Sequence, residues 1–317
     1  MSNTIDRRML LAGACAFAAS PCGADAASGI ATIRLWPGAP PGGAGVKVAD
    51  QWVLRSPTGP ADDIAWPHVA TPTLTVTPAI KPNGAAVLLI PGGGYRRIAL
   101  RRGGSNEARL FAARGITAFD LLYRLPHDGW SAGPDAPLQD AQRAMRLIRR
   151  DAAKWGIDPT RIAALGFSAG GHLAARLGSR ATRTTYASID AAGRLSAAPA
   201  VLGLFFPVIE LLGPAAHGES RRELLGDKAT DDRARAFSAD TDLPADMPPT
   251  YVACAADDPV VSPLNSIAMF DALQKAKIAS ELSIYERGGH GFPAPEPDGG
   301  PTLWPDGFLR FARRHGL

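Results

Sequence analysis

The residues with the clearest chemical potential are a serine, an aspartate and a histidine that follow one another along the chain. Ser168 lies in Gly166-Phe167-Ser168-Ala169-Gly170, between a short apolar run and a stretch rich in alanine and leucine. This context predicts a strand-to-helix corner, where flanking glycines let strand and helix pass closely and the hydroxyl projects above the sheet edge. So short a pattern also occurs by chance, so the rest of the chain must decide whether the serine is catalytic.

Two later residues could supply the base and the acid that a serine nucleophile needs. Asp258 follows the apolar run 250–256 and precedes Pro259-Val260-Val261, as expected of a loop at the carboxyl end of a strand. His290 follows the apolar run 282–285 and is flanked by glycines, which leave its ring free to reach the serine. The order of serine, acid and histidine fits a nucleophile corner of this kind. We therefore predict that Ser168, Asp258 and His290 form a catalytic triad.

Other acids and histidines compete for these roles. Asp257 adjoins Asp258, but Asp-x-x-Val beginning at Asp258 fits the acid loop better. His172 lies one turn beyond the corner, where a histidine more often packs or hydrogen-bonds locally. His127, in a loop near the expected mouth of the site, and Tyr95 are candidate substrate contacts. The surroundings of the other histidines suggest no chemistry: His68, His217 and His315.

A glycine-rich loop could stabilise the tetrahedral oxyanion of acyl transfer. Pro91-Gly92-Gly93-Gly94-Tyr95 directly follows the apolar run 85–90. Backbone N–H groups aimed at the developing charge are what this chemistry requires, and we expect them from Gly93, Gly94 and Ala169. A phosphate-binding loop is the weaker interpretation, because the lysine of a P-loop and the spacing of a dinucleotide fingerprint are missing. His-Glu-x-x-His and similar ligand spacings are also missing, so we expect no metal and no cofactor.

The pattern of apolar runs predicts an α/β fold with a mostly parallel sheet and helices on both faces. Apolar runs alternate with helical patterns, namely runs at 85–90, 116–122, 200–208, 250–255 and 282–285 and helices at 105–114, 137–155 and 267–276. Residues 30–80, rich in Pro, Gly and Thr, are expected to form exposed or edge strands. The charged residues 210–248 could be a small helical cap over the carboxyl edge of the sheet or a solvated connection.

The first 26 residues predict a signal peptide. Arg7 and Arg8 precede an uncharged run, residues 9–19, that is too short to span a membrane, and an Ala-x-Ala site ends at Ala26. The paired arginines favour twin-arginine export over an ordinary signal. We therefore expect a periplasmic or secreted protein, with residues 27–317 as one catalytic domain and no stable membrane span. Cys254 would then be the single remaining cysteine, so no intramolecular disulfide can form.

Composition narrows the possible partners. The 317-residue chain is 46% hydrophobic and has a formal net charge of +4. Its arginines are spread along the sequence rather than gathered in a block, which argues against nucleic-acid binding. The sequence carries no signal of oligomeric state, and the expected partner of the predicted triad is a small-molecule ester.

Taken together, the motifs resemble the acetyl xylan esterase-like branch of the α/β-hydrolase esterases. The matching stretches span most of the predicted mature chain and are residues 35–38, 91–95, 122–126, 140–146, 166–172, 257–261 and 288–292. The resemblance implies the α/β-hydrolase fold and a serine esterase that removes acetyl groups from xylan or related oligosaccharides. The chain departs from the pattern at Pro91, where related lipases have His, at Ser262, where Pro is common, and at residues 101–107, where relatives carry Lys-Glu-Gly.

Rival functions remain. Within the same chemistry, the alternative is a general short-chain carboxylesterase or an arylformamidase-like hydrolase. A xylanase would need two positioned carboxylates, and no acidic residues form a convincing pair beyond the adjacent Asp257 and Asp258. A non-catalytic binding protein on the same scaffold would be expected to lack a triad member, and all three are present.

Overall fold

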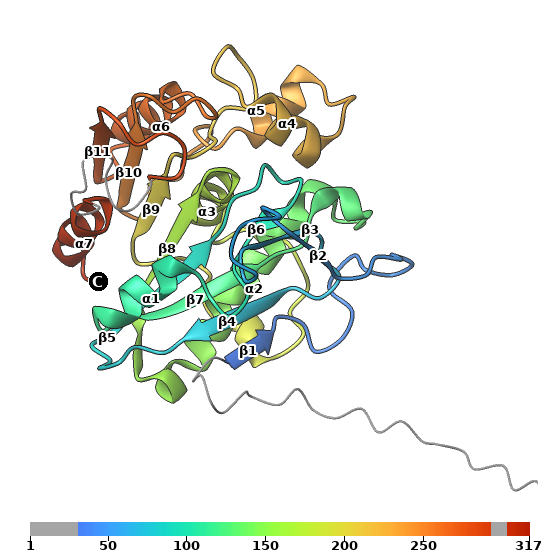
Figure 1. Cartoon of the computed structure of the whole chain (residues 1–317), viewed down its shortest axis with the longest axis vertical. Helices are drawn as coiled ribbons and strands as arrows, with labels where there is room; N and C mark the ends of the chain where they lie inside the picture. Colours follow the sequence, from blue (N-terminus) through green and yellow to red (C-terminus); the bar gives the residue numbers. More distant parts are fainter. Residues whose placement is uncertain (1–30, 293–302) are drawn as a thin grey trace, which may run out of the picture.

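An eight-stranded sheet forms the centre of the computed structural model, which describes residues 31–292 and 303–317 (Figure 1). The strand order is β1-β4-β7-β5-β8-β9-β10-β11. The pairs β1–β4 and β4–β7 are antiparallel, and every pair from β7 to β11 is parallel. The strands are β1 (Ala31–Arg34), β4 (Thr73–Thr77), β5 (Gly84–Ile90), β7 (Thr117–Leu122), β8 (Ile157–Phe167), β9 (Leu202–Phe205), β10 (Thr250–Ala255) and β11 (Ser280–Tyr285). The predicted signal peptide, residues 1–26, lies outside the described residues.

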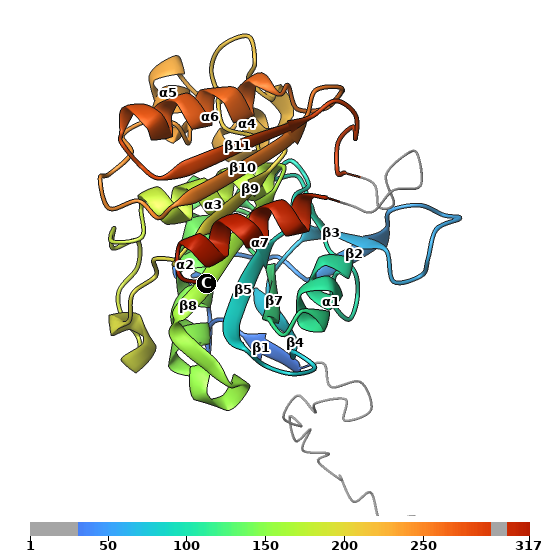
Figure 2. The same cartoon turned by 90° about the vertical axis from the view of Figure 1, so that its left-hand side faces the viewer.

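Helices cover both faces of this sheet, as predicted (Figure 2). One face packs against α1 (Asn106–Ala113) and α7 (Trp304–Arg314), and the other against α2 (Ala136–Arg150), α3 (Ala169–Ser179) and α6 (Leu264–Lys275). The central strand β5 alternates between the two layers, because Val87 joins the first core and Leu88 the second. None of the described helices is both long and apolar enough to cross a bilayer.

Part of the N-terminal segment lies inside the large sheet, whereas exposed or edge strands were expected for residues 30–80. Only β1 lies at the edge of the large sheet, whereas β4 lies between β1 and β7 and buries Leu74 and Val76. A second, three-stranded sheet contains β2 (Gln51–Leu54), β3 (Ile64–His68) and β6 (Ile98–Ala99). The segment 210–248 contains two helices, α4 (Gly218–Leu225) and α5 (Asp231–Phe237).

Local sequence explains where the helices begin and end. Ser105 caps α1 by accepting a hydrogen bond from the Ala108 N–H, and Gly115 follows the helix with a φ of 82°. The helix predicted over 137–155 divides in two: α2 ends at Arg150, and a 3-10 turn (Ala152–Trp155) runs to Gly156 at φ 64°. Glycine adopts this left-handed conformation without steric cost, so it ends the helix as predicted.

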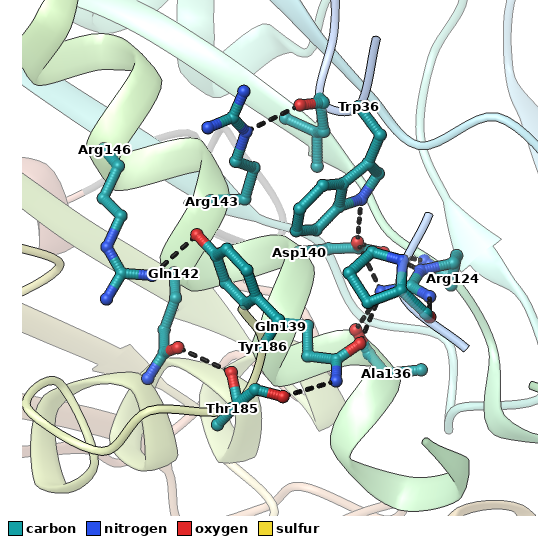
Figure 3. Close-up of polar contacts among 12 residues, drawn as sticks. Trp36, Arg124, Ala136, Gln139, Asp140, Gln142, Arg143, Arg146, Thr185 and Tyr186 are labelled. Atoms are coloured by element: carbon teal, nitrogen blue, oxygen red, sulfur yellow. Dashed lines mark hydrogen bonds and ion pairs between the residues drawn. The ribbon is translucent and has the colours of Figure 1, made fainter. Parts of the chain in front are cut away.

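A buried polar network joins the N-terminal loop, the loop after β7 and the helix α2 (Figure 3). The Asp140 carboxylate accepts from Trp36 Nε1 at 2.7 Å, from the Arg124 N–H at 2.8 Å and from Arg124 Nε at 2.9 Å. Arg124 and Asp140 are both 0% exposed. The remaining Arg124 donors reach the carbonyl oxygens of Pro41 and Ala136. Every charge in this network is therefore compensated.

The first prediction concerns this network. Asp140→Ala leaves the Arg124 guanidinium buried without its carboxylate, so we expect unfolding to become easier by about 3–5 kcal/mol. The matched control is Asp271→Ala, which removes an exposed i,i+4 pair with Lys275 and should cost about 0.5 kcal/mol or less. Denaturant unfolding of both variants checks the difference, and equal losses would contradict the role given to the network.

The second prediction concerns Asp120 on β7, which is 1% exposed. Burial raises its pKa to about 6, although hydrogen bonds from the Ser105 hydroxyl and N–H oppose the shift. Because the unfolded chain ionises more readily, the carboxyl group should destabilise the fold as pH rises from about 4 to 6. Relative to Asp120→Asn, the wild type should lose about 2 kcal/mol of unfolding free energy between about pH 4.5 and pH 7.5.

Denaturant unfolding at both pH values measures this loss. The exposed Asp271→Asn serves as the control, and its stability difference from wild type should stay within about 0.5 kcal/mol across the same range. A wild-type to Asp120→Asn difference that does not change with pH would contradict the account.

Candidate active site

The backbone around Ser168 forms a sharp corner between β8 and α3. Ser168 has φ 56° and ψ −123°, a conformation that residues with a Cβ rarely adopt. Its neighbours require glycine, because a Cβ on Gly166 would lie 2.2 Å from the Gly170 carbonyl oxygen, and one on Gly170 would lie 2.1 Å from the Ile90 carbonyl oxygen. The predicted strand-to-helix corner is therefore present.

The structure brings Ser168, His290 and Asp258 together. His290 Nε2 lies 2.9 Å from Ser168 Oγ, and His290 Nδ1 lies 2.8 Å from Asp258 Oδ2. With the Asp258 carboxylate accepting from Nδ1–H, Nε2 is left free to accept the serine proton. The imidazole also packs edge-on against the Phe206 ring, with centroids 4.8 Å apart. This is the arrangement of nucleophile, base and orienting acid that serine acyl transfer uses.

The two neighbouring aspartates occupy different positions. The Asp258 side chain is fully buried, and its Oδ1 accepts from the N–H groups of Val260 and Val261 at 2.8 and 3.0 Å. Burial opposes ionisation, but the hydrogen bonds from His290, Val261 and Val260 outweigh it and lower the pKa of Asp258. Asp257 is exposed and accepts from the Gly289 N–H at 2.8 Å, beside the histidine. Asp258 therefore orients the ring, and Asp257 contacts the loop that carries it.

The loop after β5 lies directly beside the serine. A Cβ on Gly92 would be 2.8 Å from Ser168 Cβ, and Gly93 and Gly94 have φ values of 134° and 68°. Within residues 31–292 and 303–317, the N–H groups of Gly93, Gly94 and Ala169 have no hydrogen-bond acceptor. Three backbone N–H groups without an acceptor, close to the Ser168 hydroxyl, are the donors that an oxyanion site needs.

A cavity of about 440 Å³ opens onto the serine. Its apolar part includes Phe167, Phe206 and Trp304, and its polar part includes His217 and Glu219 from the segment 210–248. That segment therefore contributes to the cavity wall, one of the two possibilities left open by the sequence. Trp304 and Phe206 carry no sequence signal of a site, because only the tertiary fold brings them to the cavity that His290 lines.

Two candidate substrate contacts lie elsewhere. Tyr95 is 1% exposed, and its hydroxyl donates to His172 Nδ1 at 2.8 Å, while His172 Nε2 donates to the Phe237 carbonyl oxygen. Burial and the nearby Arg176 lower the pKa of His172 to about 3, so the ring is neutral. His127 lies against the Pro67 carbonyl oxygen at 3.0 Å. Neither Tyr95 nor His127 lines the cavity, in contrast to the expectation.

One group of potential metal ligands occurs in the described part of the chain. Donor atoms of His68, His127 and Asp128 lie within 4.8 Å of one another. His68 Nδ1 already pairs with Asp128 Oδ1 at 2.6 Å, and Asp128 Oδ2 accepts from the Val69 N–H. None of the three lines the cavity at Ser168. The contacts of this group are thus to one another and to the backbone of Pro67 and Val69.

Comparison with known proteins places this site in a family. The sequence profile of the BD-FAE family matches residues 75–273. Endo-1,4-beta-xylanase B of Butyrivibrio fibrisolvens is 34% identical over 65% of this chain and 32% of its own length. Acetylxylan esterase of Xylanibacter ruminicola is 30% identical over 67% of this chain and 42% of its own length. The chain thus spans less than half of the length of either of these curated relatives.

Solved structures agree on the fold. An acetyl ester-xyloside bifunctional hydrolase from Caldicellulosiruptor lactoaceticus superposes with a TM-score of 0.64 at 29% identity, covering 90% of this chain and 93% of that one. The carboxylesterase Cest-2923 from Lactobacillus plantarum gives 0.61 at 21% identity, covering 85% and 98%. The predicted fold and family resemblance are both confirmed: the chain belongs to the BD-FAE family and has the α/β-hydrolase fold.

Proposed function

We propose that this chain is a serine esterase that hydrolyses short-chain esters through an acyl-enzyme. The observation that carries the proposal is His290, which bridges Ser168 Oγ at 2.9 Å and Asp258 Oδ2 at 2.8 Å at the mouth of a cavity. The names of the Xylanibacter ruminicola relative and the Caldicellulosiruptor lactoaceticus structure support ester chemistry. The xylanase name belongs to a protein of which only 32% aligns with this chain, so we do not extend that activity.

The geometry supports a two-step reaction. Ser168 Oγ attacks the ester carbonyl carbon while its proton passes to His290 Nε2, and the oxyanion is held by the N–H groups of Gly93, Gly94 and Ala169. The imidazolium then gives the proton to the alcohol oxygen as the C–O bond breaks. Water next loses a proton to His290 and attacks the acyl carbon. The bond from that carbon to Ser168 Oγ then breaks, and His290 returns the proton to Oγ, which releases the acid and restores Ser168. Asp258 remains ionised throughout and stabilises the imidazolium.

Substrate and location are narrower proposals. Acetyl groups on xylan or related oligosaccharides are the proposed substrate, supported by the names of the two relatives above. A general short-chain carboxylesterase or an arylformamidase-like enzyme is the alternative, and rates across acyl lengths, set beside acetate release from acetylated xylan, separate them. Export is proposed from the signal-like residues 1–26, which are outside the described structure; the mature N-terminus of the exported protein tests it.

The nucleophile assignment gives a direct prediction. Ser168→Ala removes the attacking oxygen, so hydrolysis of p-nitrophenyl acetate should fall on the order of 10⁴-fold or more while the thermal unfolding midpoint is preserved. The exposed Ser196 is the matched control, and Ser196→Ala should keep wild-type rates. Substantial activity in folded Ser168→Ala would exclude the assignment.

The oxyanion loop gives a further prediction. A Cβ on Gly93 would lie 2.1 Å from the Arg97 carbonyl oxygen at a φ of 134°, so Gly93→Ala must displace the N–H donors. We expect kcat to fall about 10²- to 10³-fold. Gly38→Ala, where a Cβ meets no atom within 4 Å, should leave kcat unchanged. Equal rates for the two variants would show that the loop does not hold the oxyanion.

A further inference from the structure

One wall of the cavity at Ser168 is built from arginines. They come from the loop after β5 and from segments flanking the small sheet of β2, β3 and β6, and they are Arg55, Arg96, Arg97 and Arg101. Three of the four form ion pairs: Arg55 with Asp63 at 3.2 Å, Arg96 with Glu219 at 2.8 Å and Arg101 with Asp62 at 3.1 Å. Within the described ranges, Arg97 has no carboxylate at ion-pair distance. Among the described residues, it is the arginine of this wall without an ion-pair partner.

The surroundings of Arg97 disfavour its positive charge. The residue is partly buried, and burial, followed by the positive charges of Arg96 and Arg55, lowers its pKa, with partial compensation from Glu219. A guanidinium nevertheless stays charged near neutral pH. An anion that entered the cavity would relieve both the burial and the like-charge repulsion.

Arg97 also contacts the expected oxyanion loop. Its N–H donates to the Gly93 carbonyl oxygen at 3.2 Å, and a Cβ placed on Gly93 would be 3.3 Å from Arg97 Cγ. The arginine side chain therefore starts beside the oxyanion loop and lines the cavity that contains Ser168. A substrate whose carbonyl oxygen is bound by Gly93 and Gly94 would extend along the same wall.

None of the described carboxylates that line the cavity forms an ion pair with Arg97. Asp63 and Glu219 are engaged by other arginines, and Asp120 is engaged by Ser105 on the side of α1. Glu107 lines the cavity as well, but it is not within ion-pair distance of Arg97. Asp63 and Glu219 thus lie within the basic wall, each paired with an arginine other than Arg97.

We propose that Arg97 is a specificity-determining residue that binds a carboxylate carried by the ester substrate. The planar guanidinium can donate two parallel hydrogen bonds to a carboxylate, which gives orientation as well as attraction. The inference rests on the proposed esterase function and narrows its substrate to acidic esters. The carboxylate could lie on the alcohol side, as in an acetylated oligosaccharide with a uronic acid, or on the acyl side, as in a half-ester of a dicarboxylic acid.

Matched pairs of esters test the proposal. For the alcohol side, kcat/KM is measured on p-acetoxybenzoate and on its neutral methyl ester. For the acyl side, it is measured on mono-p-nitrophenyl succinate and on neutral p-nitrophenyl butyrate. In one of the two pairs, Arg97→Gln should lower kcat/KM for the anionic ester, relative to kcat/KM for the neutral ester, about 10- to 100-fold. The loss should come mainly from a higher KM for the anionic ester. The pair that responds identifies the side that carries the carboxylate.

Controls separate recognition from folding. Arg97→Lys keeps the charge but loses the paired donors, so its preference for the anionic ester should lie between that of Arg97→Gln and that of the wild type. Glu107→Gln should not lower this preference. Hydrolysis of the neutral esters by Arg97→Gln should stay within about twofold of wild type. Unchanged ratios in both pairs, or equal losses on neutral and anionic esters, would overturn the role of Arg97. Failure of the wild type to hydrolyse any of the four esters would instead contradict the esterase assignment.

Discussion

The backbone conformation of Ser168 is the constraint on which the rest of the site depends. A φ of 56° with ψ of −123° costs of the order of 1–3 kcal/mol and persists only if the surroundings enforce it. The Ser168 N–H donates to the Phe205 carbonyl oxygen, and its own carbonyl oxygen accepts from Gly171 and Val208. The neighbouring strand β9, the helix α3 and the chain after β9 thus fix the corner together, and the hydroxyl projects toward His290 as a result.

Several stretches that carry the family resemblance serve this framework rather than the chemistry. Trp36, Arg124, Asp140 and Arg143 come from three of the matching stretches, and the structure places all four in the buried network or beside it (Figure 3). Arg143 donates to the Leu35 carbonyl oxygen and pairs with Asp190 through two hydrogen bonds. The network binds the N-terminal loop to α2, which packs against α3 behind the serine. Residues that match a family pattern can therefore stabilise the fold rather than take part in the reaction.

Sequence reasoning succeeded where the signal was local and periodic. The apolar runs predicted β5, β7 and β10 almost to the residue, and the glycines around Ser168 predicted the corner. Sequence reasoning failed where the structure depends on the direction of a side chain or on the pairing of strands far apart in the chain. Tyr95 adjoins the glycine loop but points its hydroxyl at His172, and β4 pairs with β7 across 40 residues of chain. The basic wall around Arg97 is likewise assembled from separate segments, so no single motif predicts it.

The central claim is that Ser168 carries the acyl group between two chemical steps. Acid quenching of the enzyme during turnover of an activated acetyl ester, followed by mass spectrometry of the peptides, tests this directly. We expect one acetyl group on the peptide that contains Ser168, and none on the corresponding peptide of Ser168→Ala. Turnover at full rate with acetyl groups absent from Ser168, or present on another residue, would contradict the account.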